Sequence, residues 1–190
     1  YDNLSYKYTA LTGNISLAFH PDDSWKVATI ASTGFHAPNI DDTGKLFYKG
    51  SILTIPNFNL EPEYARTLEL NITKNLNNRL LFNVNTYYTF IEDAIMRVNT
   101  NLDFQINQDE FFTEAKTNEN TGNAEIYGTT ASASLRIASN YTLETDYTII
   151  KGRNIDNDLP FTHIPPSFGK TAFYADFDSW RASFFIMYNG

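Results

Sequence analysis

The sequence predicts an all-β chain that folds as an antiparallel up-and-down sheet of about eight strands. The first observation is the aromatic content, 12 Tyr, 15 Phe and 2 Trp among 190 residues, because aromatic side chains fit a pleated surface. The second is the alternation of apolar and polar residues along about eight segments, which is the period of a strand with two different faces. The third is the order of connections, which run short, long, short, long, short, long and short. Up-and-down barrels are built in this way.

Four of the predicted strands lie in the first half of the chain. We expect them at residues 11–19, 25–33, 65–73 and 80–91. The last has the clearest alternation, with one face made of Leu80, Phe82, Val84, Thr86, Tyr88 and Phe90. Residues 20–24 and 75–78 are predicted tight turns, because Pro fixes φ and Asp and Asn side chains bind nearby backbone groups.

The other four strands are expected at residues 125–138, 141–149, 171–177 and 180–188. Two-residue turns, Ser139-Asn140 and Asp178-Ser179, join them in pairs. In each strand the aromatic and aliphatic residues take one face, and Thr, Ser and charged residues take the other.

Three long loops, at residues 34–62, 92–121 and 151–168, separate the hairpins. Loops longer than about 12 to 15 residues are uncommon in compact domains, and three at one end of a sheet favour a membrane barrel. The second loop has seven acidic residues. Three of them, Asp103, Asp109 and Glu110, have the oxygen ligands that Ca²⁺ prefers, but the spacing is not that of a regular calcium loop, and we interpret the segment as a solvated acidic loop.

The two faces of the strands also favour a transmembrane barrel. Charged residues lie in mid-strand on the polar face, which suits a water-filled lumen. The opposite face carries aromatic residues that suit the interfacial girdles of such barrels, namely Trp25, Tyr88, Tyr141, Tyr147, Trp180 and Tyr188. Glu144 and Asp146 could form an acid pair for catalysis, but we expect them to pair with Arg136 or to be hydrated. We therefore predict no catalytic site.

Composition excludes several other functions. There is no Cys, so disulfides and thiolate metal sites are absent. The three His residues have no metal-ligand spacing, and we predict no metal and no cofactor. A formal net charge of −8 disfavours nucleic acid as a partner. The chain begins at Tyr1 within a pattern and stops inside an aromatic strand, so we expect residues 1–190 to be part of a larger barrel domain.

Two motifs at the ends of the first long loop carry a family resemblance. They are Gly34-Phe35-His36-Ala37-Pro38-Asn39 and Ile55-Pro56-Asn57-Phe58-Asn59-Leu60-Glu61-Pro62-Glu63. They resemble paired segments in the barrels of TonB-dependent outer-membrane receptors, where a Phe-Arg-Ala-Pro-Asn-like segment ends one strand and a Pro-Asn-(Pro)-x-Leu-x-Pro-Glu segment opens the next. Residues 120–128 and 159–166 are similar to later segments of the same family.

This resemblance implies a section of a barrel of about 22 strands around a plug, with the plug outside this chain. It implies a receptor in the outer membrane of a Gram-negative bacterium that takes up a scarce nutrient with energy from the TonB complex, which acts through the plug. It implies no enzyme activity. The partners would be outer-membrane lipid, the plug, the remaining strands and the nutrient complex.

Two departures from the family motifs affect the expected ligand. His36 replaces the usual Arg, and the chain has no His between Pro38 and Asn57, where haem receptors of the family carry one. A ferric siderophore is therefore the favoured ligand. Because aromatic side chains give contact area at low entropic cost, the candidate ligand contacts are His36, Tyr48, Phe111 and Phe112.

Two alternatives have different topologies. Eight strands are enough to close a small barrel that acts as an adhesin or anchor, in which the first strand would pair with the last. A soluble lipocalin-like binder would instead turn its aromatic face inward to line a pocket. A section of a larger barrel would leave both edge strands free and would be unstable as a monomer in water.

Overall fold

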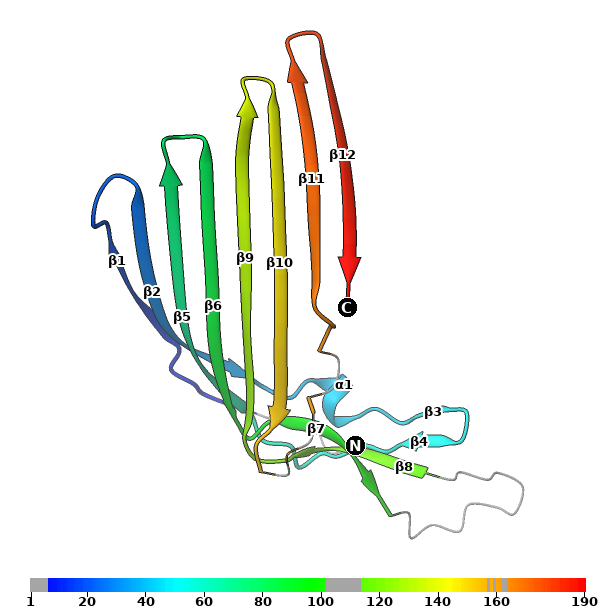
Figure 1. Ribbon diagram of the computed structural model, residues 1–190. Coiled ribbons are helices and arrows are strands. Elements are labelled where there is room, and N and C mark those ends of the chain that lie inside the picture. The colour runs from blue at the N-terminus through cyan, green and yellow to red at the C-terminus, as the bar shows by residue number, and fades with distance from the viewer. Residues whose placement is uncertain (1–6, 102–113, 157, 159, 162–163) are drawn as a thin grey trace.

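The computed structural model describes residues 7–101, 114–156, 158, 160–161 and 164–190. Its main body is one curved sheet of eight strands (Figure 1). In chain order these are β1 (Gly13–Phe19), β2 (Trp25–His36), β5 (Glu63–Leu76), β6 (Leu80–Glu92), β9 (Ala124–Ala138), β10 (Tyr141–Asn154), β11 (Phe168–Phe177) and β12 (Trp180–Asn189). All eight predicted strands are present, and most extend further toward the loops than the alternation indicated.

Each strand pairs antiparallel with its neighbours along the chain, in the order β1-β2-β5-β6-β9-β10-β11-β12. Short hairpin turns lie at one end of the sheet, called here the turn end, and the long connections lie at the other, the loop end (Figure 1). Among the described residues, β1 pairs only with β2, and β12 pairs only with β11. The sheet is an open arc, so the alternative of a closed eight-strand barrel is wrong.

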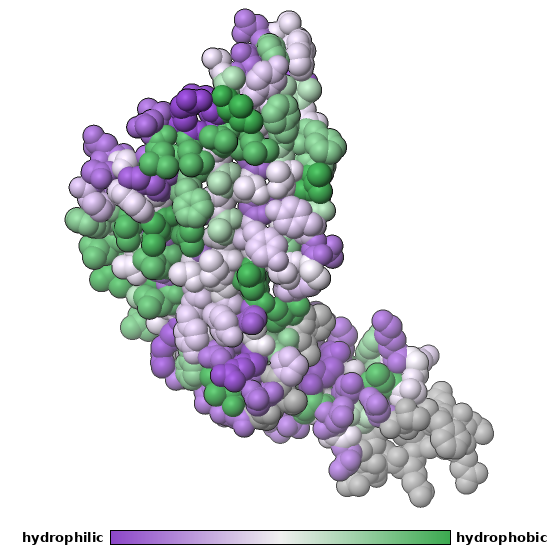
Figure 2. All heavy atoms as spheres, viewed as in Figure 1, coloured by the Kyte–Doolittle hydropathy of each residue, from purple (hydrophilic) through white to green (hydrophobic). Residues whose placement is uncertain are grey.

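The apolar face of this sheet is the more exposed one and the polar face is the more buried one, which is the reverse of a soluble protein. Along β5 the apolar residues Leu68 and Leu70 are exposed, whereas Thr67 and Glu69 on the other face are half-buried. Figure 2 shows hydrophobic residues gathered over the middle of the strands, with hydrophilic residues toward both ends. We call the side with the exposed aromatic and aliphatic residues the aromatic face, and the other side the polar face. A lipocalin-like binder, which would enclose its aromatic face, is therefore also wrong.

Aromatic side chains on the aromatic face form two rows. Near the turn end, Tyr141 contacts Phe173 and Phe177, and Phe177 stacks on Trp180 with ring centroids 4.4 Å apart. Near the loop end, Tyr147 stacks on Tyr188 at 6.1 Å. From Trp180 to Tyr188 the strand rises roughly 26 Å at about 3.3 Å per residue. This spacing matches the apolar band of about 25 Å in outer-membrane barrels.

Threonine and asparagine pairs connect neighbouring strands. The hydroxyls of Thr130 and Thr148 lie 2.9 Å apart, and the Asn71 and Asn83 side chains hydrogen-bond across β5 and β6. The register places Arg136 opposite Thr142 and Glu144 opposite Ser134. We expected Glu144 and Asp146 either to pair with Arg136 or to be hydrated. Among the described residues neither carboxylate forms an ion pair with Arg136, so the pairing is not observed.

Two of the long loops contain regular structure that the sequence did not predict. They form a second, four-stranded sheet in the order β3-β4-β8-β7, together with one short helix. Its elements are α1 (Ile40–Thr43), β3 (Phe47–Lys49), β4 (Ile52–Thr54), β7 (Ile95–Thr100) and β8 (Glu114–Asn120). This sheet lies at the loop end (Figure 1). In the described part of the chain, no helix has the length and apolar character needed to cross a membrane.

Candidate functional site at the loop end

The two motif segments of the first long loop come together on adjacent strands. His36 ends β2 and Glu63 begins β5, and the two residues are opposite each other in the register. The His36 Nδ1 atom lies 2.7 Å from Glu63 Oε2, and Nε2 lies 3.6 Å from Asp42 Oδ2 in α1. The other Glu63 oxygen accepts a hydrogen bond from the Ile95 backbone N–H at 2.6 Å. This carboxylate therefore connects β2, β5 and β7 on the polar face, at the mouth of the arc.

The end of the first motif caps the short helix. The Asn39 side-chain oxygen accepts hydrogen bonds from the backbone N–H groups of Asp41 and Asp42. In return, the Asp42 carboxylate accepts the Asn39 N–H at 2.9 Å, which completes a capping box. Asp42 is thus held where it can approach His36.

Asn57 of the second motif connects the helix to the second sheet. Its backbone N–H donates to the Thr43 carbonyl at 2.9 Å, and its side-chain amide donates to the Asn118 carbonyl at 2.8 Å. The Asn118 side chain donates in turn to the Asp42 carbonyl. Leu60, three residues later, is only 3% exposed. The Asn and the Leu of this motif therefore have structural roles in the loop.

The first and second long loops pair directly with each other. The strand β4 from the first loop runs parallel to β8 from the second, and the Ile55 N–H donates to the Lys116 carbonyl at 2.9 Å. The Asn120 side chain accepts the Glu61 N–H and donates to the carbonyls of Glu61 and Asp93. These contacts join the two loops into one unit. The sequence does not predict this unit, because neither loop segment has the alternation of apolar and polar residues that indicates a strand.

The third long loop is attached through a buried asparagine that sequence reasoning missed. Asn154 has no exposed surface and donates to both the carbonyl and the hydroxyl of Thr121. Its side-chain oxygen accepts the Asp156 N–H, and the Asp156 carboxylate accepts the Asn123 N–H at 2.8 Å. Asn154 ends a strand at the start of a loop, a position where Asn is common, so no signal in the sequence distinguished it.

The remaining residues of the motifs are backbone or packing positions. Gly34 lies opposite Ala65 in the register, and Phe35 packs on Tyr64 with ring centroids 5.4 Å apart. Pro38 lies between β2 and α1, and Pro56 and Pro62 lie between β4 and β5.

The predicted ligand contacts are placed only in part. The His36 side chain is 49% exposed, and Tyr48 in β3 is 68% exposed. Tyr48 belongs to an exposed apolar group at the β3 hairpin, with Leu46 and Phe47. Phe111 and Phe112 lie outside the described residues, as do the hypothesised calcium ligands Asp103, Asp109 and Glu110. In the described part of the chain, no group of three or more His, Asp or Glu residues is arranged to hold a metal ion.

Comparisons with solved structures identify the same architecture. The chain is similar to the copper transporter OprC, with 16% identity and a TM-score of 0.76 over 93% of this chain and 26% of that one. The ferric enterobactin receptor PfeA from Pseudomonas aeruginosa has 14% identity and a TM-score of 0.76, over 94% of this chain and 27% of that one. The hemophore receptor HasR of Serratia marcescens has 16% identity and a TM-score of 0.73, over 93% and 31%.

The chain thus spans about a quarter to a third of the length of these structures. No curated protein sequence matches it. The family model described as TonB dependent receptor-like, beta-barrel matches residues 1–190. An open arc of up-and-down strands agrees with this match, and the chain therefore belongs to the TonB-dependent receptor-like β-barrel family.

Proposed function

We propose that this chain is a section of an outer-membrane receptor that takes up a scarce nutrient with energy from the TonB complex. The observation that carries the proposal is the inverted sheet, which exposes an apolar aromatic face and keeps a polar face on the inside of the arc. That arrangement suits lipid outside and water inside. The family consists of transport receptors and not enzymes, in agreement with the absence of enzyme activity predicted from the sequence.

The remaining strands and a plug inside the barrel are supplied, in this proposal, by the rest of the receptor. The joined loops and the outer surface of the plug capture the nutrient complex. The TonB complex then acts through the plug to open a path along the polar face. The coverage of about a quarter of the similar structures supports this division, because a barrel of their size needs many more strands than the chain provides.

A ferric siderophore is the ligand we propose. The ferric enterobactin receptor is among the similar structures, and the chain has no His between Pro38 and Asn57 that would favour haem. Exposed aromatic side chains suit an organic chelate, because they give large contact area at low entropic cost. The contacts we propose are Tyr48 and His36 in the described loops, with Phe111 and Phe112 in the second loop.

The test measures binding by the full-length receptor that contains this chain, with a ferric catecholate siderophore, haem and Cu²⁺ as separate probes. We expect tight binding of the siderophore, and Tyr48→Ala should weaken it roughly tenfold, the loss typical of one aromatic contact. Ile40→Ala, an exposed apolar change in α1 at the same end, is the matched control and should bind as wild type.

Uptake of the labelled siderophore by iron-starved cells, with and without a functional TonB complex, tests the transport step. Tight binding of haem or Cu²⁺ without binding of the siderophore would contradict the proposed ligand but not the proposed receptor function. Uptake that does not depend on the TonB complex would overturn the proposed mechanism.

A further inference from the structure

We propose that two neighbouring arginines, Arg79 and Arg136, form a binding site for an oxyanion, a phosphate or a carboxylate group, on the polar face at the turn end. The site lies at the opposite end of the sheet from the loops that are proposed to capture the nutrient. The inference therefore goes beyond nutrient capture. Only one of the two sources of the anion, a carboxylate of the plug, rests on the proposed function.

The register places the two arginines next to each other. Leu80 at the start of β6 lies opposite Leu135 in β9, so Arg79 and Arg136 face each other one position nearer the turn end. The Arg136 backbone N–H donates to the Arg79 carbonyl at 2.7 Å, in agreement with this position. Because Leu80 and Leu135 belong to the aromatic face, the residues next to them belong to the polar face. Like charges directly opposite in a sheet repel each other, so this pair is unfavourable unless an anion lies between the two groups.

Both guanidinium groups line one polar hollow with a volume of about 510 Å³. The other lining residues are neutral, namely Asn75, Asn78, Leu81, Ser134 and Thr142. The chain as a whole has a formal net charge of −8. A hollow lined by two arginines and no carboxylate is therefore a local excess of positive charge in an acidic chain.

Neither arginine is compensated within the part of the chain that the structure describes. None of the ion pairs there includes Arg79 or Arg136. The Arg79 guanidinium donates only to the Ile137 carbonyl, at 3.4 Å. Glu144 lines the adjoining hollow, but its carboxylate accepts the Ser134 hydroxyl at 3.5 Å instead. The N–H groups of both guanidiniums thus remain available to an anion.

Neutral donors in the hollow add to this site. The Asn78 side-chain oxygen accepts the Asn75 amide at 2.9 Å, whereas the Asn78 NH₂ group forms no hydrogen bond among the described residues. The hydroxyl of Thr142, which lies opposite Arg136 in the register, forms none there either. Guanidinium groups bind oxyanions with paired N–H groups. Two of them with these added donors can bind several oxygens of one phosphate or carboxylate.

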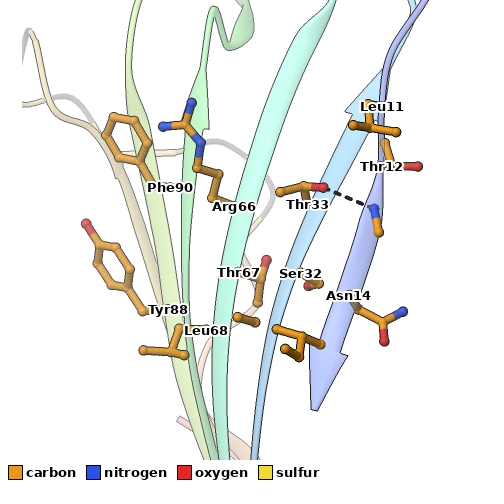
Figure 3. Close-up of a pocket in the computed structure, with 13 residues that line it drawn as sticks. Leu11, Thr12, Asn14, Ser32, Thr33, Arg66, Thr67, Leu68, Tyr88 and Phe90 are labelled. Carbon is orange, nitrogen blue, oxygen red and sulfur yellow. Dashed lines mark hydrogen bonds between the residues drawn. The ribbon is translucent and has the colours of Figure 1, made fainter.

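The position of this hollow differs from that of the larger one drawn in Figure 3. The larger hollow, about 830 Å³, lies on the aromatic face and opens on β1, whose free edge the remaining strands of the proposed receptor would cover. The turn-end hollow is formed by β5, β6, β9, β10 and the turn between β5 and β6, and each of these strands is paired on both sides. Further strands at the edges of the arc therefore leave it open.

The experiment is a double-variant cycle in the full-length receptor, with Arg79→Gln, Arg136→Gln and the two combined. Hydrogen exchange is measured for the backbone amides of residues 132–135, whose intrinsic rates the substitutions do not change. Each single substitution should speed exchange roughly tenfold, because the bound anion loses a charge-assisted hydrogen bond. The double variant should exchange little faster than either single one, because the anion is already lost. Without an anion, each single substitution would relieve repulsion and slow exchange.

Lys26→Gln is the matched control. Lys26 is exposed, lies opposite Thr73 on the polar face and is not part of the hollow. Its removal takes away the same charge and should leave exchange at residues 132–135 unchanged. Arg136→Lys keeps the charge but loses the paired N–H groups, so it should speed exchange less than Arg136→Gln. Heat-dependent migration in electrophoresis verifies that each variant is folded.

Inorganic phosphate, added at constant ionic strength, identifies the source of the anion. If the site takes a free anion, phosphate should slow exchange in wild type and not in Arg136→Gln. If a carboxylate of the plug fills the site, phosphate should have no effect, while the cycle keeps its result.

Unchanged or slower exchange in either single Gln variant would overturn the proposal, as would losses that simply multiply in the double variant. An equal loss in Lys26→Gln would overturn it too, because it would assign the effect to net charge. TonB-dependent uptake of the siderophore is measured on the same variants. Uptake without the expected cycle would contradict only this inference, and the expected cycle without such uptake would contradict only the proposed function.

Discussion

The imidazole of His36 lies 2.7 Å from the carboxylate of Glu63, and these residues end and begin the strands on either side of the first long loop. The loop is thus closed at its base by a side-chain contact as well as by the sheet. Glu63 also accepts the Ile95 N–H, so the same carboxylate anchors the second loop.

Replacing Glu63 by Ala should destabilise the loop end of the receptor by about 1 to 3 kcal/mol, because the half-buried Ile95 N–H loses a charged acceptor. Limited proteolysis of the full-length receptor should then cut the second loop faster than in wild type. The control is Glu61→Ala, since Asn120 binds the backbone of Glu61 and not its side chain. Equal protection in both variants would contradict this role of Glu63.

The sequence was informative about the main sheet because each of its strands has a different environment on its two faces. Two different environments on the two faces impose a period of two, and this pattern located all eight strands, including the clear alternation in β6. The strand ends were less predictable. β10 continues to Asn154 because its last residues still pair with β9, although their alternation is weak.

The second sheet could not be predicted for the same reason. The sequence of β8, Glu-Ala-Lys-Thr-Asn-Glu-Asn, is polar except for Ala115, and its pairing with β4 depends on residues about 60 positions away in the chain. The structure brings the two motif segments together at the base of the first long loop, but the sequence did not indicate that Asn57 and Asn39 bind backbone groups. A pattern of residue types does not show which backbone group an Asn side chain will bind. It also did not show that Arg136 would form no ion pair with Glu144 or Asp146 among the described residues.

Gly122 is predicted to be intolerant of any side chain. Its φ of +90° is in the region that favours glycine, and a Cβ atom there would collide with the Asp156 carboxylate. Gly122→Ala should lower stability by about 1 to 3 kcal/mol through backbone strain and displacement of the third loop. Gly50→Ala has a similar φ of +63° with open space around it, so it should cost only about 1 kcal/mol. Thermal unfolding of the full-length receptor compares them, and equal losses would show that the Asp156 contact is unimportant.

Asn57 is predicted to hold the two long loops together. Asn57→Ala removes the hydrogen bond to the Asn118 carbonyl and should weaken the pairing of β4 with β8. Hydrogen exchange of the β8 amides in the full-length receptor should become roughly tenfold faster, as expected for the loss of about 1 to 1.5 kcal/mol. Asn59→Ala is the control, because only the backbone of Asn59 takes part in the described hydrogen bond with Asn57. Unchanged β8 exchange in Asn57→Ala would mean that the strand pairing alone joins the loops.

Asp22 at the turn end gives a pH-dependent prediction. The hydroxyl and backbone N–H of Ser24 both donate to its carboxylate and hold the pKa of Asp22 below its ordinary value. Because the folded pKa is lower than the unfolded one, the carboxylate stabilises the turn above the unfolded pKa of about 3.9, and this contribution is lost as the pH falls through the folded pKa. Hydrogen exchange of the Ser24 amide, corrected for its intrinsic pH dependence, should therefore show protection that declines in that acidic range.

Asp22→Ala should remove both the protection and its pH dependence, whereas Asp23→Ala at the adjacent exposed position should leave both unchanged. If Asp23→Ala removed the pH dependence, the titrating group would be Asp23 and not Asp22, and the prediction would be contradicted.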